Sequence, residues 1–530
     1  MLVVYLLLFT FRLYECRAFL IQENNTSLST CLENIISHWI KKGSPITYVD
    51  LNYQDDDIVR SIQRMNLNTV VSRKVDKRID HYNNAYIIAA GSFEIFKKEF
   101  KQLSKERHWK PNVYFIIIFS ENFPNPLTDL FDILLRYHVF NVITINGTSD
   151  VKIFTYDPFE NNGCGKKYFD IKCFNNCSNT SIAKLYSSRF DKILKGCTFN
   201  YATSHRAPYS IKPKMRNDTI NFLGTEQFVL KMLAEIEGFK IKFVATYDFD
   251  IYPVVKEDMS ATGALSLIQK GDVDIVFGGI LLLRERAEAF SCFYEHLAYI
   301  DEFVILVKKA GPVPPWKNIY LEFTYQVWFL LFVTFFVFFA IFVILFHIKD
   351  KCNIMLIMCG LLFQQGYKKG FNFKMECFIF QWVIFAFLIN TYYQSNLSGL
   401  TTHVSYNYQV SNEKDIKEYQ MEPCISNIVK TLINSTIGTN YNVDMDEDCN
   451  KITTSIQTVS KNYKKYTLVS HSLYKFNRYN FTDDFGNPLL YTFKIPTSKI
   501  IYAVYFYKGF PKINILRNNA LRIRESGLLQ

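Results

Sequence analysis

The stretch FTYQVWFLLFVTFFVFFAIFVILF, residues 323–346, contains no charged residue and decides how the rest of the chain is organised. A helix rises about 1.5 Å per residue, so a run of this length spans the roughly 30 Å hydrocarbon core of a bilayer. Tyr325 and Trp328 stand at one end, where interfacial aromatic residues are common. The stretch predicts a transmembrane helix over residues 323–347. A helix buried in a soluble core is less favoured, because such cores seldom need so long an apolar run.

A second uncharged run, CFIFQWVIFAFLINTYYQSNL, follows a single glutamate and predicts a transmembrane helix over residues 376–397. The apolar segment between the two runs, residues 352–366, is too short to span and has the length expected of a re-entrant loop. We expect this loop to line a pore, with amide oxygens from Gln364 and Gln365 and a backbone turn at Gly366. The TVGYG filter of potassium channels is absent, which predicts a weakly selective cation pore.

Positive charge flanks the short segment and predicts that its ends are cytoplasmic. Lys349, Lys351, Lys368, Lys369 and Lys374 stand there against Asp350 and Glu376. Both long flanking regions then face the lumenal side. Sequons for N-glycosylation occur on both sides of the hydrophobic centre and indicate the same topology. They begin at Asn24, Asn25, Asn146, Asn176, Asn179, Asn217, Asn434 and Asn480. The expected glycosylation sites among them are Asn146, Asn176, Asn217, Asn434 and Asn480.

The first residues, MLVVYLLLFTFRLYECRA, are typical of a secretory signal peptide over residues 1–18. The usual positively charged start is missing, so an N-terminal membrane anchor is the alternative. The charge-free run ends at Arg12, which makes it too short for a full span.

Cysteine usage fits an oxidising compartment. Eight cysteines remain outside the signal and the membrane region, and an even number permits disulfides. They are Cys31, Cys164, Cys173, Cys177, Cys197, Cys292, Cys424 and Cys449. Cys424 could pair with Cys449, but the sequence does not give the full connectivity. A zinc site is the alternative, and the missing paired C-x2-C spacing disfavours it.

Composition and motifs exclude several function classes. The net charge is +11 without blocks of Lys or Arg, so there is no nucleic-acid footprint. No nucleophile elbow, phosphate loop or metal cluster is present, and we expect neither enzyme activity, a cofactor nor a metal. Ser472 follows His471 directly, but adjacency in sequence is not the geometry of a catalytic triad.

The regions on either side of the hydrophobic centre alternate between helical and strand patterns. GTEQFVLKMLAEIEGFKIKFV predicts a helix followed by a strand, and GALSLIQKGDVDIVFGGI repeats that order. Downstream, DCNKITTSIQTVSKNYKKYTLVSHSLYKF predicts helix, strand and helix, and IIYAVYFY is a strand-sized run. This alternation predicts an α/β fold with a ligand cleft beyond the strand ends.

Several stretches, in the right order, resemble the insect chemosensory ionotropic receptors, a divergent branch of the ionotropic glutamate receptors. GDVDIVFGGILLLRERAEAFSCFYEHLAYIDEFVILV, DKILKGCTFNYATSHRAPYS, FQQGYKKGFNFKMECFIFQW and TYYQSNLSGLTT carry the resemblance. The stretch RYHVFNVITINGTSDVKIFTYDPFENNGCG resembles the N-terminal region of those receptors. The similarity covers most of residues 110–530.

The resemblance implies a fold of α/β domains plus transmembrane helices. A bilobed, periplasmic-binding-protein-like clamshell would be interrupted by a channel of two helices and a re-entrant loop. Clamshell closure on a small ligand would open a cation pore. The resemblance also implies that the chain assembles with co-receptor subunits of the same family into a heterotetramer. This assembly would lie in the plasma membrane of sensory neurons. The implied segments are a short α/β N-terminal region over residues 19–190, the first half of the ligand-binding domain over 191–315, and its second half over 403–530.

The resemblance also suggests residues for the ligand and the gate. Arg284 matches the arginine that binds the ligand carboxylate, although a surface arginine beside other charges is the alternative. Tyr209 matches a tyrosine of the cleft, and a packed aromatic is the alternative. His471 stands where an acidic residue would hold an amino group, and Gly279 stands in place of a threonine. We therefore expect a ligand other than glutamate.

Two departures affect the predicted channel. TYYQSNLSGLTT takes the place of the family's gate motif, which it matches at Asn396 and Leu397. The family also has a third full membrane helix after the second half of the binding domain, and we expect that helix to be absent from this sequence. The alternative function is therefore a non-conducting, membrane-tethered binding or regulatory subunit.

Overall fold

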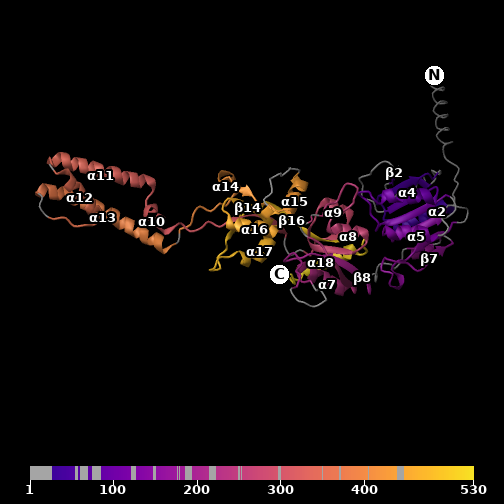
Figure 1. The fold of residues 1–530 in the computed structure, drawn as a ribbon. Coiled ribbons are helices and arrows are strands. Elements are labelled where there is room, and N and C mark those ends of the chain that lie inside the picture. Colours follow the sequence, from indigo (N-terminus) through magenta and orange to yellow (C-terminus); the bar gives the residue numbers. More distant parts are fainter. Residues whose placement is uncertain are drawn as a thin grey trace, which may run out of the picture.

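The structure, a computed structural model, has three β-sheets flanked by helices and a separate group of long apolar helices (Figure 1). It describes residues 27–53, 58–59, 62, 70–73, 85–120, 127–146, 151–175, 177, 179–185, 194–213, 222–248, 251, 253–296, 300–348, 350–368, 372–403, 405–437 and 447–529. The predicted mixed α/β architecture with two candidate membrane-spanning helices is confirmed. The predicted signal peptide lies outside the described residues.

The N-terminal unit is a sheet of order β2-β1-β3-β4-β5-β6-β7. Its strands are β1 (Ile46–Leu51), β2 (Val70–Arg73), β3 (Ala85–Ala90), β4 (Tyr114–Phe119), β5 (Val142–Asn146), β6 (Ile153–Tyr156) and β7 (Ile171–Phe174). The first five strands in the sheet order are parallel, and the last two are antiparallel. Helices α2 (Ser27–Trp39) and α6 (Asn179–Leu185) share a core with one face, and α4 (Phe93–Leu103) and α5 (Leu127–Arg136) with the other. Burial on both faces explains the continuous apolar strands, such as YFIIIF.

Lobe 1 comprises residues 194–296 and 502–529, and its sheet has the order β11-β17-β10-β8-β9. The strands are β8 (Thr198–Thr203), β9 (Lys240–Thr246), β10 (Ile275–Leu281), β11 (Ser291–Phe293) and β17 (Tyr502–Phe506). The helices are α7 (Thr225–Glu237), α8 (Ala264–Lys270), α9 (Arg284–Ala289) and α18 (Ile513–Glu525). β17 pairs with β10 and β11, and α18 packs into the same core. The C-terminal part of the chain therefore completes lobe 1.

Lobe 2 comprises residues 301–308 and 413–500, and its sheet has the order β13-β14-β12-β15, with β16 also paired to β12. The strands are β12 (Asp301–Lys308), β13 (Glu422–Pro423), β14 (Lys465–Ser470), β15 (Leu490–Thr492) and β16 (Ser498–Ile500). The helices are α14 (Glu413–Glu418), α15 (Asn427–Ile437), α16 (Ile452–Lys461) and α17 (His471–Asn477). β12 pairs with three strands that follow it by more than 150 residues. The chain therefore crosses twice between the lobes, before Asp301 and after Ile500.

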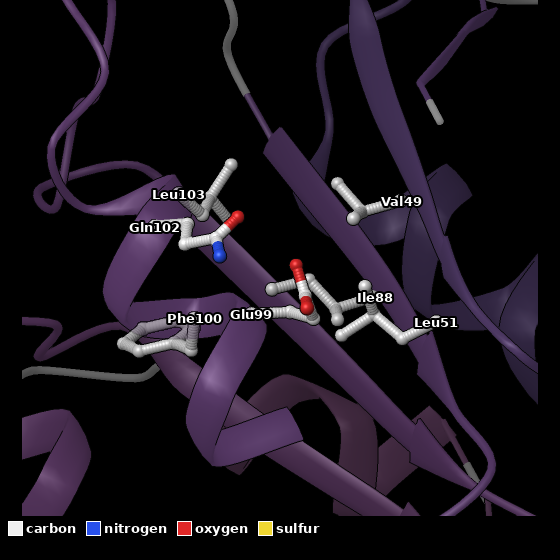
Figure 2. A pocket seen from close by; sticks show the side chains of 7 residues that line it. All are labelled: Val49, Leu51, Ile88, Glu99, Phe100, Gln102 and Leu103. Atoms are coloured by element: carbon white, nitrogen blue, oxygen red, sulfur yellow. The ribbon is translucent and has the colours of Figure 1, made fainter. Parts of the chain in front are cut away.

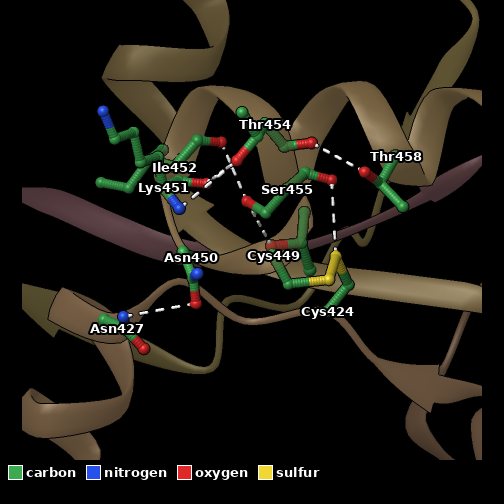
Figure 3. Close-up of a disulfide and its surroundings, with 10 residues drawn as sticks. Cys424, Asn427, Cys449, Asn450, Lys451, Ile452, Thr454, Ser455 and Thr458 are labelled. Atoms are coloured by element: carbon green, nitrogen blue, oxygen red, sulfur yellow. Dashed lines mark hydrogen bonds between the residues drawn. A yellow bond between two sulfur atoms is a disulfide. The ribbon is translucent and has the colours of Figure 1, made fainter. Parts of the chain in front are cut away.

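Three disulfides lie among the described residues, and their cysteines are 25 to 146 residues apart in sequence. Cys31–Cys177 lies within the N-terminal unit, and Cys164–Cys197 joins that unit to lobe 1. The predicted pairing of Cys424 with Cys449 is confirmed. Figure 3 shows this bond beside the first turns of α16. Cys173 and Cys292, which completed the even count, are not disulfide-bonded.

The helical group consists of α10 (Pro315–Leu321), α11 (Tyr325–Phe346), α12 (Lys351–Leu362) and α13 (Phe373–Thr402), at the far end of the molecule from the N-terminal unit (Figure 1). α11 and the stretch Phe373–Gly399 of α13 are long and apolar enough to cross a membrane. Only 11% and 17% of their most apolar 18-residue stretches are buried within the structure. A helix from a soluble core would be mostly buried, so the exposure of these apolar surfaces fits candidate membrane-spanning helices better than core helices.

The shorter helix α12 packs between α11 and α13 around a small apolar core. That core contains Phe335, Phe342, Ile354, Met358, Ile379 and Trp382. The indole nitrogen of Trp382 donates to the carbonyl of Met358 at 3.1 Å. The side chain of Asn390 donates to the carbonyl of Leu362 at the end of α12. α12 is therefore attached to α13 by both apolar packing and hydrogen bonds.

Candidate functional site

A cluster of buried polar side chains lies where the two lobes meet. Its members come from the loop after β8, the start of α7, the start of β12 and the junction of β14 with α17, and the backbone in the middle of β10 contacts them. The loop after β8 doubles back on itself, because Arg206 and Ser210 exchange backbone hydrogen bonds of 2.7 and 2.9 Å. This tight loop brings Arg206 and Tyr209 to the same region between the lobes.

Arg206 is a buried cation of lobe 1. Its guanidinium donates to the carbonyl of Gly279 and, at 3.0 Å, to the hydroxyl of Tyr502. It also lies 4.8 Å from the centre of the Tyr502 ring. Burial raises the pKa of Tyr502 to about 12, although Arg206 acts in the opposite direction. The tyrosine therefore stays protonated, and a buried guanidinium is held against an aromatic face.

Asp301, at the start of β12, ties the two lobes together. Its carboxylate accepts from the hydroxyl of Tyr209 at 2.7 Å, the hydroxyl of Ser470 at 2.6 Å and the backbone N–H of Ser472 at 3.1 Å. Burial raises the pKa of Tyr209, and neighbouring Tyr502 and Asp301 act in the same direction. The Tyr209 hydroxyl therefore stays protonated and donates a hydrogen bond to Asp301. One carboxylate thus joins the β8 loop of lobe 1 to β14 and α17 of lobe 2.

Glu226, in the first turn of α7, holds the backbone of β10 in an unusual conformation. Its carboxyl oxygen accepts from the N–H groups of Gly278 and Gly279 at 2.7 and 3.0 Å. Both glycines have positive φ, 128° and 72°, which side-chain-bearing residues rarely adopt. Glu226 is fully buried, and its other oxygen lies 3.6 Å from a ring nitrogen of buried His296. The bent strand turns the Gly279 carbonyl toward Arg206.

A narrow cleft between the lobes has Arg206 and Arg286 in its wall. Its volume is about 20 Å³, and it is lined by lobe 1 residues together with Ile428 of lobe 2. Arg286 is 1% exposed and donates to the carbonyls of Leu281 and Pro253. Two guanidinium groups suit an anionic ligand, since each can engage a carboxylate through two N–H donors. The present volume has room for about one water molecule.

The structure brings only some of the predicted ligand residues together. Tyr209 lies at the cluster, and Gly279 contacts Arg206. His471 is the exposed first residue of α17, one position before the Ser472 amide that binds Asp301. Arg284 lies outside the cluster. Its side chain is 73% exposed and pairs with Glu288 at 2.9 Å, one helical turn away.

Sequence reasoning missed Arg206, Glu226 and Asp301. Arg206 stands three residues before Tyr209, inside a stretch that carried the family resemblance. Because Arg206 lies in the same loop as the predicted cleft tyrosine, the sequence could have indicated that it also lies at the cleft. The role of Asp301 could not be predicted from the sequence, because three of its hydrogen-bond partners come from segments 92 to 171 residues away.

The predicted pore residues follow α12. Gln364 and Gln365 are exposed, and Gln364 adopts a left-handed backbone with φ 59°. Gly366 has no heavy atom near the position of an added Cβ. Asn396 and Leu397, the predicted gate residues, lie half-buried in α13. Their roles stay predictions.

The expected glycosylation sites are only partly described. Asn480 is exposed in lobe 2, and Asn146 is half-buried at the end of β5. The backbone of Asn434 lies in α15. Asn176 and Asn217 lie outside the described residues.

A second hollow lies in the N-terminal unit between α4 and the sheet. Figure 2 shows its lining by Val49, Leu51, Ile88, Glu99, Phe100, Gln102 and Leu103. Its volume is about 10 Å³, which leaves room for no more than about one water molecule. It is not a ligand site in this conformation.

No protein-family model matches the chain, and no curated protein matches it. The resemblance to the insect ionotropic receptors therefore stays a prediction.

The effects of substituting Gly279 and Arg206 on the stability of the protein are expected to be coupled. A Cβ at position 279 would lie 2.9 Å from Cδ of Arg206 and 3.0 Å from Cδ2 of Tyr209. Replacing Gly279 by alanine should therefore destabilise the protein by about 2–3 kcal/mol, from crowding and positive-φ strain together. The Gly279→Ala change should cost less in an Arg206→Ala background, where the crowding is relieved. Thermal unfolding of the four proteins of this double-mutant cycle tests the coupling, and strict additivity would contradict it.

Proposed function

We propose that this chain is a subunit of a ligand-gated cation channel that detects chemical cues other than glutamate. The resemblance to the chemosensory ionotropic receptors suggests the plasma membrane of sensory neurons and partner subunits of the same family. Two lobes joined by two crossings, with the apolar helices inserted between β12 and α14, support this proposal. The membrane would take up the exposed apolar faces of α11 and α13.

The ligand would bind between the lobes. A pair of crossing segments is the arrangement of a hinge, which allows two lobes to close on a ligand. The cleft of about 20 Å³ corresponds to a closed form, so ligand entry requires the lobes to separate. Arg206 and Arg286 favour a ligand with a carboxylate, and the hydrogen bond from Tyr209 to Asp301 would be broken on opening. A carboxylic acid is therefore the proposed class of ligand.

The observation that carries the proposal is the pairing of the two segments that connect lobe 2 to the helices. Residues 309–314 lead from β12 to α10, and residues 405–412 lead from α13 to α14. The N–H of Val313 donates to Ser405 at 2.8 Å, and the N–H of Asn407 donates to Gly311 at 3.0 Å. A movement of lobe 2 would act on both segments at once and would separate them as the gate opens, which is how a binding domain can act on a gate.

Contacts beyond the linkers would carry this movement to the predicted gate. The hydroxyl of Tyr393 in α13 donates to the carbonyl of Ile319 in α10 at 2.8 Å. Phe323 stacks on Tyr392, with ring centres 5.9 Å apart. Both tyrosines precede the predicted gate residue Asn396 by about one helical turn. A shift of α10 would therefore act directly on the gate end of α13.

The experiment that tests the proposal joins the two linkers covalently. Pro312 and Tyr406 are exposed and face each other in an antiparallel bridge without hydrogen bonds between them. Such pairs have Cα atoms about 4.5 Å apart, which is within the range of a disulfide. We expect the Pro312→Cys, Tyr406→Cys double variant, co-expressed with same-family subunits, to form that disulfide. Currents evoked by a panel of carboxylic acids should then fall by at least about tenfold and return on reduction, since opening requires the linkers to part.

Each single-cysteine variant is the matched control and should conduct normally under both conditions. A disulfide that forms but leaves the currents unchanged would contradict gating through separation of the linkers. If labelled acids bind, yet no acid evokes a current before or after reduction with any partner tried, the non-conducting binding subunit becomes the better account.

A further inference from the structure

Helix α4 of the N-terminal unit presents four lysines on one exposed side. They are Lys97, Lys98, Lys101 and Lys105, and all four are exposed. Positions advance by about 100° around a helix, so the four lysines fall within an arc of about 100°. Lys105 stands just after the helix, where the preceding Ser104 keeps a helical backbone. We call these four residues the lysine face.

The packing of α4 holds the lysine face toward solvent. Phe96, Phe100 and Leu103 are buried in the core between the helix and the sheet. Glu99 is also on that side and lines the small hollow between α4 and the sheet (Figure 2). Because the apolar residues fix the rotation of the helix, the lysines cannot turn inward. The lysine face is therefore a permanent part of the surface of the N-terminal unit.

The lysine face keeps a net positive charge. Glu94 stands one helical turn before Lys98, at one end of the face. Asp258 of lobe 1 is near enough to Lys105 for the two charges to interact, but its carboxylate also accepts from the N–H and the hydroxyl of Ser260. Among the described residues, no ion pair joins a lysine of this face to a carboxylate. Four ammonium groups thus face one carboxylate at each end.

The shape of the lysine face suits an extended polyanion. At about 1.5 Å per residue, Lys97 and Lys105 lie about 12 Å apart along the helix axis. A polymer with an anionic group on each repeating unit can engage several of these lysines at once. Each lysine ammonium group acts as a point charge on a flexible stem, so it can follow such a chain without a fixed paired geometry.

The compartment of the N-terminal unit narrows the class of polyanion. The disulfide Cys31–Cys177 lies within this unit, and Cys164–Cys197 joins it to lobe 1. Disulfides persist outside the cell, where sulfated polysaccharides are available and nucleic acids are scarce. A lipid headgroup is disfavoured, because α4 lies at the end of the molecule away from the candidate membrane helices (Figure 1).

We propose that the lysine face of α4 binds a sulfated polysaccharide of the cell surface or the extracellular matrix. The sulfate groups would contact Lys98, Lys101 and Lys105, since Glu94 weakens the other end of the face. This interaction would attach the N-terminal unit to the material that surrounds the cell. The proposal is independent of the proposed channel function, because it concerns a surface of the N-terminal unit and its test measures binding, not current.

The test uses the purified full-length chain and a fluorescein-labelled heparin octasaccharide. The matched probe is the same octasaccharide with its sulfate groups removed and its carboxylates retained. Fluorescence anisotropy should show saturable binding of the sulfated probe and none of the desulfated probe. Binding should weaken by at least about tenfold when salt rises from about 50 to about 200 mM, because salt competes for the lysine charges.

Variants of exposed lysines locate the binding surface without disturbing the core. Lys98→Gln, Lys101→Gln should weaken binding of the sulfated probe by about tenfold, because it removes two of the four charges. Lys98→Arg, Lys101→Arg keeps both charges and should restore binding. The matched control is Lys41→Gln, Lys42→Gln, which removes the same charge from two exposed lysines elsewhere in the N-terminal unit. It should bind like the unmodified protein.

Four results would overturn the proposal. The first is absence of binding of the sulfated probe to the unmodified chain, and the second is equal binding of the desulfated probe. The third is an equal loss of binding in the glutamine variant of α4 and in the matched control, which would mean attraction by net charge alone. The fourth is displacement of the probe by single-stranded RNA at lower concentration than by unlabelled heparin, which would identify nucleic acid as the better ligand.

Discussion

Replacing Asp301 by alanine is expected to destabilise the two lobes severely, by about 3–9 kcal/mol. The change leaves the hydroxyls of Tyr209 and Ser470 and the N–H of Ser472 buried without their acceptor. Each such orphaned group costs about 1–3 kcal/mol. The total is comparable with the roughly 5–15 kcal/mol that stabilises a whole domain. The thermal midpoint of the purified full-length chain should fall by about 10 °C or more.

Two further variants make this expectation specific to the Asp301 contacts. Asp301→Asn keeps one acceptor oxygen and the side-chain volume, so its midpoint should fall clearly less than that of the alanine variant. Asp272→Ala removes an exposed aspartate of lobe 1 and should leave the midpoint within about 2 °C. If Asp301→Ala behaved like Asp272→Ala, the proposed tie between the lobes through Asp301 would be wrong.

The apolar helices and most of the α/β elements could be predicted from the sequence because their signals are local. The charge-free run 323–346 predicts a helix long enough to cross a membrane, and α11 coincides with it almost completely. Helical spacing in TEQFVLKMLAEIE predicts α7 without knowledge of its neighbours. The pairing of Cys424 with Cys449 was predictable because only 25 residues separate them.

The exchange of strands between the lobes could not be predicted. DEFVILVK and YAVYF both have strand patterns, but a pattern does not name the sheet that a strand joins. β12 directly follows lobe 1 in sequence and lies at the centre of the sheet of lobe 2, whereas β17 returns to lobe 1. The contacts of Asp301 with Tyr209, Ser470 and Ser472 depend on this placement of β12.

Arg284 and Arg206 show the same division between local and long-range signals. Arg284 was predicted to bind the ligand carboxylate because of its place in a motif of the family that the chain resembles. The spacing of Arg284 and Glu288, four residues apart, also predicts an exposed ion pair on one helical face, and the structure has that pair. Arg206 has no helical pattern around it. Its burial follows from β10 and β17, which supply the Gly279 carbonyl and the Tyr502 hydroxyl.

Replacing Arg206 by glutamine is expected to raise the acid concentration for half-maximal response by about 100-fold in the proposed channel. A guanidinium in a water-poor cleft can bind a carboxylate through two charge-assisted hydrogen bonds, whereas a glutamine side chain offers only a neutral amide. A loss of about 2.7 kcal/mol corresponds to that factor. The measurement is a dose–response series of currents with the carboxylic acid that acts best on the unmodified channel. Surface labelling and the thermal midpoint should accompany it, because Arg206 also stabilises the β8 loop.

The control variants show whether Arg206 or Arg284 binds the carboxylate of the ligand. Arg206→Lys keeps the charge but not the planar pair of donors, so its response should lie between those of the glutamine variant and the unmodified protein. Arg522→Gln removes an exposed arginine of α18 and should have no effect on the response. If Arg284→Gln abolished the response to the acid while Arg206→Gln left it unchanged at equal surface levels, the carboxylate would bind at Arg284, as the resemblance suggests. The two lobes would then have to rearrange around α9, because Arg284 is not among the residues that line the cleft with Arg206.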